Sequence, residues 1–94
     1  MSAAPDPRAV IVRAPNVSYS SLDGEVLVID TSRRKSHRLL ETASFIWQRC
    51  DGRNTVDDIV AAMTSVYDVA HDDAERDVRE MVGQWIDAGI AKQA

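Results

Sequence analysis

The chain has 94 residues, 45% of them hydrophobic, and a formal net charge of −4 at pH 7. This size supplies one modest hydrophobic core and excludes two independent domains. The single cysteine, Cys50, excludes an internal disulfide and a metal site built from several thiolates.

The first eight residues are small or polar and include Pro5 and Pro7, which predicts a flexible N-terminal lead (residues 1–8) before a single domain at residues 9–94. No stretch of about 18 apolar residues occurs in the chain. The prolines, with Asp6 and Arg8, also interrupt the place where a signal peptide would have its apolar core. We therefore expect a cytoplasmic protein without membrane association.

Short segments with β-strand character follow. Residues 9–12 and 17–21 are separated by a turn signal, Ala-Pro-Asn. Residues 25–30, EVLVID, contain an unbroken apolar run, which predicts a central strand with both faces nearly covered. Residues 35–39 are expected to return antiparallel to it, with one face made of Lys35, His37 and Leu39.

Three helical segments come next, because the hydrophobic period changes from two residues to three or four. The first carries an apolar stripe from Ala43 to Cys50 and is expected to end at Asp51-Gly52. Capping-box spacings at residues 55–58 and 72–75 open the second and third helices, and Gly89 ends the last. This order predicts an α+β domain of winged-helix type, a three-stranded antiparallel sheet followed by three helices.

Catalytic chemistry has little support in this sequence. His37 and His71 belong to no recognisable catalytic or metal-binding spacing. Cys50 lies on the apolar stripe of the first helix, as a buried structural cysteine does. Acidic pairs at residues 57–58 and 72–73 lie in first helical turns, where helix capping explains them. We expect a protein that is not an enzyme and has neither a cofactor nor a metal site.

The charge distribution separates two kinds of partner. Residues 1–40 contain six Lys/Arg and four Asp/Glu, whereas residues 41–94 contain five and eleven. The basic cluster Arg33, Arg34, Lys35 and Arg38 would suit the wing of a nucleic-acid binder. The third helix is acidic, however, and would repel phosphates. A winged-helix nucleic-acid-binding regulator is therefore only the alternative, and we expect no nucleic-acid partner.

The same cluster fits a strand that binds a peptide. Residues 35–39 are expected to form an edge strand, whose unpaired amides and carbonyls can accept an extended segment of another chain. Cations on this edge would attract an acidic partner, or they would serve only as gatekeepers against aggregation. Both interpretations remain open at this point, and so does a homodimer formed through the edge strand.

Five short motifs occur in register along the chain: LLETA at 39–43, Ile46-Trp47, Asp51-Gly52, TVDDI at 55–59 and Asp77-Val78. Together they resemble the PqqD-like family, the peptide-binding modules known as RiPP recognition elements, over roughly residues 17–91. One departure is Leu40, where the family commonly has an Asn that can cap a helix, and this favours a helix start at Thr42.

The resemblance implies a function and a site. Members of the family bind the leader segment of a ribosomally made precursor peptide as an added strand and deliver it to a leader peptidase or another modifying enzyme. The likeness leans towards lasso-peptide biosynthesis rather than pyrroloquinoline quinone (PQQ) synthesis. It implies a peptide-binding site on the edge strand and the last helix: Arg33, Arg34, Lys35, Ser36, His37, Arg38, Leu39, Leu40, Asp77, Glu80, Met81, Gln84 and Trp85.

Overall fold

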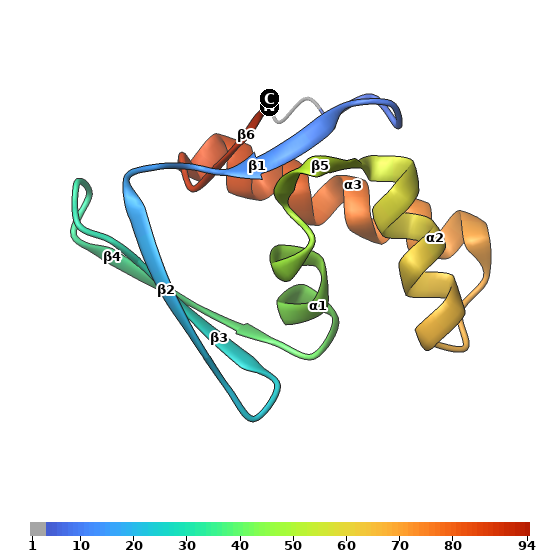
Figure 1. Ribbon diagram of the computed structural model, residues 1–94, viewed down its shortest axis with the longest axis horizontal. Coiled ribbons are helices and arrows are strands. Elements are labelled where there is room, and N and C mark those ends of the chain that lie inside the picture. Colours follow the sequence, from blue (N-terminus) through green and yellow to red (C-terminus); the bar gives the residue numbers. More distant parts are fainter. Residues whose placement is uncertain (1–3) are drawn as a thin grey trace.

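The computed structural model describes residues 4–94 as a sheet packed against helices (Figure 1), which confirms the predicted α+β class. Residues 1–3 of the predicted flexible lead lie outside the described part. Within residues 4–94 the elements are β1 (Val10–Arg13), β2 (Val17–Leu22), β3 (Glu25–Asp30), β4 (Lys35–Leu40), α1 (Thr42–Gln48), β5 (Asp51–Thr55), α2 (Val56–Val66), α3 (His71–Ala88) and β6 (Ala91–Gln93).

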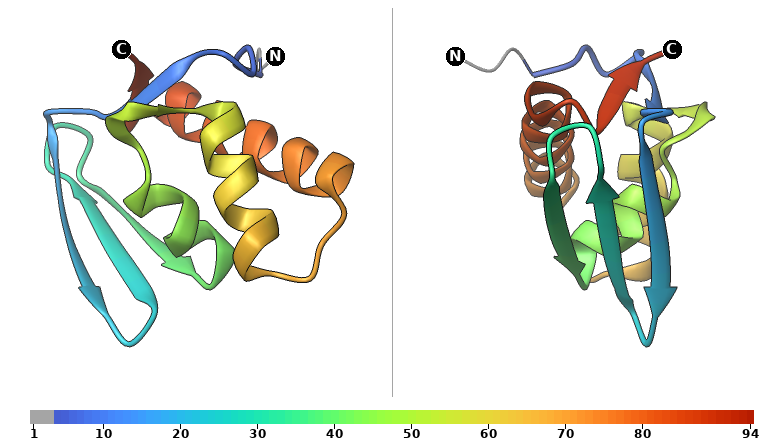
Figure 2. Two further views of the ribbon diagram at one scale, coloured as in Figure 1. Left: turned by 45° about the vertical axis from the view of Figure 1, so that its right-hand side comes forward. Right: turned by 90° about the vertical axis from the view of Figure 1, so that its left-hand side faces the viewer.

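The main sheet is antiparallel and has the strand order β2-β3-β4. β3 is the central strand, as its apolar run predicted. The prediction that both its faces are covered is wrong, because Val26 and Val28 are fully buried while Leu27 is 43% exposed. Figure 2 shows the reason: the helices lie on one side of this sheet and leave its other face open.

A second, small sheet has the order β5-β1-β6 and lies at one end of the molecule, above α1 in Figure 1. It was not expected, because β5 consists of the polar residues Asp-Gly-Arg-Asn-Thr. Gly52, with φ +82°, lies within β5. The expectation that Asp51-Gly52 ends the first helix is therefore wrong; α1 ends at Gln48, with Arg49 as its C-cap.

The ends of the other helices follow local chemistry. Thr55 and Asp58 form a capping box at the start of α2, as predicted. The second predicted capping box is wrong, since α3 begins at His71 with no side-chain cap and Asp72 is fully exposed. Gly89 ends α3 in the left-handed conformation, at φ +78°, which glycine adopts without steric cost. Within residues 4–94 no helix is long and apolar enough to cross a membrane.

The core lies between the inner face of the main sheet and the helices, and Trp47 of α1 is at its centre. Its ring makes edge-on contacts with Tyr19 of β2 and Trp85 of α3, at centroid distances of 5.8 and 5.3 Å. Such contacts stabilise aromatic pairs beyond their buried area. They connect the sheet to the helix that forms one wall of the site described below.

The segment before β1 is bonded to the helices. Arg79 of α3 donates a hydrogen bond to the carbonyl of Pro5 at 3.0 Å, and the amide of Asp57 in α2 donates to the carbonyl of Pro7 at 2.9 Å. Pro5 itself is buried. Residues 5–7 therefore cover the start of α2 and the middle of α3.

Candidate functional site

β4 is an edge of the main sheet, paired with β3 on one side and with no strand on the other within residues 4–94. Its side chains alternate as predicted. Leu39 lies opposite Val26 and His37 opposite Val28, so both face the helices. Arg38 lies opposite Leu27, on the open face of the sheet. The unpaired backbone groups of such an edge can accept another extended chain.

A cavity of about 410 Å³, the β4–α3 groove, lies between this strand and the last helix. On the helix, residues 81, 84, 85 and 88 recur at the spacing of one face, which gives the groove a continuous wall. Five of the eight lining residues are apolar and three are polar. The lining residues are His37, Arg38, Leu39, Ala43, Met81, Gln84, Trp85 and Ala88.

Six of the thirteen residues expected at the site from the sequence line this groove: His37, Arg38, Leu39, Met81, Gln84 and Trp85. Ala43 and Ala88 join them and were not among the expected site residues. Their only signal was membership of apolar stripes, where alanine suggests core packing. Asp77 and Glu80 are exposed on α3 outside the lining, and Leu40 is 47% exposed on the open face of the sheet.

The four cations of the basic cluster differ in whether a carboxylate lies beside them. Arg33 forms an ion pair with Asp30 at 3.2 Å. The Nε of Arg38 donates to Glu25 at 2.6 Å, across the open face of the sheet. Arg34 and Lys35, with Ser36, border a shallow hollow at the β3–β4 turn, and within residues 4–94 neither of the two cations has an ion-pair partner.

Neither the cysteine nor the histidines form a catalytic arrangement within the described residues. Burial raises the pKa of the Cys50 thiol to about 12, so a thiolate is scarce at neutral pH. Its sulfur donates to the carbonyl of Ile46 at 3.3 Å, inside the core. His71 lies near Asp72 and Glu75, with ligand atoms within 4.8 Å of one another, but at the surface and on a single turn of α3.

The described geometry agrees with comparisons to known proteins. A family model described as coenzyme PQQ synthesis protein D (PqqD) matches residues 25–91, from β3 to the start of β6. No curated protein sequence matches the chain. The solved structure of lasso peptide synthetase B1 complexed with the leader peptide is 28% identical, with a TM-score of 0.81 over 89% of this chain and 99% of that chain.

A second solved structure, TbiB1 in complex with the TbiA(beta) leader peptide, also has a TM-score of 0.81. The comparison covers 86% of this chain and 94% of that chain, at 21% identity. At this identity the likeness concerns the fold alone.

Proposed function

The chain belongs to the PqqD family, and from this premise we propose that it binds the leader segment of a ribosomally synthesised precursor peptide by adding it as a strand to β4. It delivers the bound precursor to a leader-cleaving or other modifying enzyme, in a pathway of the lasso-peptide type. The observation that carries the proposal is the open β4 edge directly beside the β4–α3 groove. The leader complex of the 28% identical lasso peptide synthetase B1 supports it.

Strand addition assigns separate tasks to backbone and side chains. The backbone of β4 supplies hydrogen bonds that set the register of the leader, and every second leader side chain enters the groove. The groove is lined by Leu39, Met81 and Trp85, so it favours apolar side chains at these alternate positions. Ordering the leader costs about 2–5 kcal/mol. The net affinity is micromolar or tighter, and a micromolar Kd corresponds to a binding free energy of about −8 kcal/mol.

The positive charge available to the leader lies at one end of β4. Arg33 and Arg38 already have carboxylate partners, whereas Arg34 and Lys35 have none within the described residues. An acidic leader residue therefore meets the turn end of the strand. Because these side chains are exposed, the attraction is screened by salt.

The protein performs no chemistry itself in this proposal. It holds the precursor at a raised effective concentration for the enzyme that does. Such a precursor is made on ribosomes, so the binding takes place in the cytoplasm. A homodimer through β4 would occupy the same backbone groups and would compete with the leader.

The nucleic-acid alternative is not favoured. α3 would be the recognition helix of a winged-helix protein, yet its charged residues are mainly acidic: Asp72, Asp73, Glu75, Asp77, Glu80 and Asp87 against Arg76 and Arg79. A helix of this charge would bring carboxylates towards phosphates.

Calorimetric titration tests the proposal, with the synthetic leader of the precursor encoded beside this protein as the probe. We expect micromolar or tighter binding that weakens as salt is added. Arg34→Glu combined with Lys35→Glu should weaken binding about tenfold at low salt, because the leader carboxylates lose both cations.

The matched control is Arg53→Glu combined with Lys92→Glu, which makes the same change in net charge on the second sheet. This control should bind the leader nearly as the parent does. Absence of binding by the parent protein would contradict the proposed function. Equal loss in both double variants would contradict the role of the β3–β4 turn and leave only a general charge effect.

A further inference from the structure

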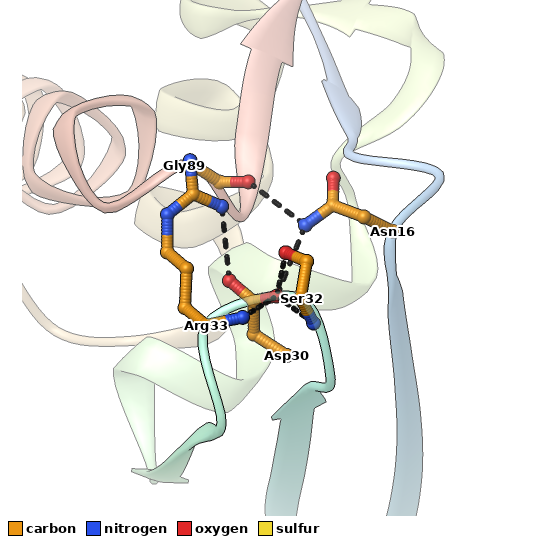
Figure 3. Close-up of polar contacts among 5 residues, drawn as sticks. All are labelled: Asn16, Asp30, Ser32, Arg33 and Gly89. Carbon is orange, nitrogen blue, oxygen red and sulfur yellow. Dashed lines mark hydrogen bonds and ion pairs between the residues drawn. The ribbon is translucent and has the colours of Figure 1, made fainter.

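Asp30, the last residue of β3, is a carboxylate in the interior, with 1% of its side chain exposed. A buried charge is costly unless hydrogen bonds replace its water. Asp30 has several donors, all shown in Figure 3. Oδ1 accepts from Ser32 Oγ at 2.6 Å, Ser32 N at 3.1 Å, Asn16 Nδ2 at 3.2 Å and Arg33 N at 3.3 Å, and Oδ2 accepts from Arg33 Nη1 at 3.2 Å.

These bonds join segments that are distant in the sequence. Asn16 belongs to the connection between β1 and β2, and its side chain also donates to the carbonyl of Gly89 at 3.4 Å. Ser32 and Arg33 form the turn between β3 and β4. Asp30 therefore links the β3–β4 turn to the C-terminal end of α3.

The guanidinium of Arg33 lies directly against this helix end. A Cβ atom at position 89 would lie 2.6 Å from Cζ of Arg33, closer than real side chains approach. The absence of a side chain at Gly89 is thus what admits the guanidinium. A cation at this place also interacts favourably with the negative end of the helix dipole.

The two ends of this link belong to the two walls of the β4–α3 groove. The turn leads directly into β4, and Gly89 directly follows Ala88, which lines the groove. Within residues 4–94 no hydrogen bond connects β4 to α3. The polar link through Asp30 is therefore what ties the ends of the two walls together.

We propose that Asp30 and Arg33 are positioning residues, which hold the start of β4 against the end of α3 and so set the width of the groove in which the leader docks. This inference rests on the proposed function. It assigns Arg33 to the link between the walls, and it leaves Arg34 and Lys35 as the cations that meet the leader.

The substitution Asp30→Asn distinguishes positioning from simple electrostatics by the sign of its effect. It removes a negative charge beneath a cationic turn, so electrostatics alone would strengthen the binding of an acidic leader. A positioning role requires that the substitution weaken leader binding. We expect leader binding about tenfold weaker in calorimetry, because the loosened groove must be ordered before it binds.

A second readout needs no leader. Trp85 is 4% exposed and lies in the helical wall of the groove. In the unliganded Asp30→Asn variant we expect acrylamide to quench tryptophan emission more strongly than in the parent protein. This result stands even if the parent protein does not bind the leader, so failure of the link and failure of the proposed function are separable.

Two further variants distinguish loss of the Asp30 link from a general loss of stability. Glu25→Gln removes the negative charge that pairs with Arg38, between the same two strands but on the open face. It should leave tryptophan quenching near the parent value, and it should not weaken leader binding, because it frees the Arg38 cation. Ser32→Ala removes the shortest bond to Asp30 and keeps the carboxylate, so it should shift both readouts in the same direction by less. The inference is overturned if Asp30→Asn binds as tightly as the parent or tighter, if its quenching is unchanged, or if Glu25→Gln has an equal effect.

Discussion

The Asp30 carboxylate carries a buried charge and also accepts the hydrogen bonds that connect the β3–β4 turn to neighbouring segments. Its hydrogen bonds, above all that from the Ser32 hydroxyl, lower the pKa of the carboxyl group from 3.8 to about 2, although burial acts in the opposite direction. The charged form is therefore favoured more strongly in the folded protein than in the unfolded chain.

This lowered pKa predicts that the stabilisation contributed by Asp30 is lost in acid. A carboxyl group whose pKa is lowered on folding stabilises the protein above its unfolded pKa, and this stabilisation is lost as the pH falls through the folded value. The free-energy difference between the parent and Asp30→Asn should thus be constant at neutral pH and shrink between pH 3.8 and about 2. Urea denaturation across this range measures it, and a difference that stays constant would contradict the assignment.

At the scale of elements, α2 and α3 differ in how they begin. Thr55 accepts a hydrogen bond from the amide of Asp58, and Asp58 accepts one from the amide of Thr55. At α3, Ala70 takes the capping position and offers no side-chain bond. A capping residue satisfies amides that would otherwise lack partners in the first turn.

We therefore expect Thr55→Ala to lower the free energy of unfolding by about 1 kcal/mol. Asp72→Ala, in the first turn of α3, should change it little, because Asp72 is fully exposed and caps no amide. Thermal and urea denaturation of the two variants give the comparison. Equal losses of stability would show that the capping box contributes nothing beyond a first-turn polar residue.

Local patterns were sufficient to predict the main sheet and the helices. The central strand has an unbroken apolar run, the edge strand β4 alternates, and the apolar residues of the helices recur every three to four positions. They could not reveal β5, whose five residues include no apolar side chain. That strand exists because its backbone pairs with β1, and such pairing depends on tertiary contacts.

The groove was predictable in part from the family resemblance. The resemblance implied a site on the edge strand and the last helix, which included His37, Leu39, Met81 and Trp85. The ion pairs Arg33–Asp30 and Arg38–Glu25 were not predicted, because they depend on strand register and on a turn with Arg34 at φ +53°. Charge counting therefore treated as equal four cations of which two have carboxylate partners and two have none within the described residues.

At the scale of the whole molecule, the main sheet has two open edges with different chemistry. β2 contains no charged residue, whereas β4 contains Lys35 and Arg38 and follows Arg34. The β4–α3 groove lies only beside β4. On the β2 side, Tyr19 packs against Trp47 and under the guanidinium of Arg13, at 4.9 Å from the ring centroid. A peptide that pairs with β4 can therefore also place side chains in the groove between this strand and α3.

Amide hydrogen exchange by NMR, with and without the synthetic leader, tests strand addition to β4 most directly. β2 (Val17–Leu22) serves as an internal control, since it is the other edge of the same sheet. We predict that saturating leader slows the exchange of outward-facing amides in β4 (Lys35–Leu40) and leaves β2 unchanged. Protection along β2, or unchanged exchange in β4 at saturation, would contradict the account.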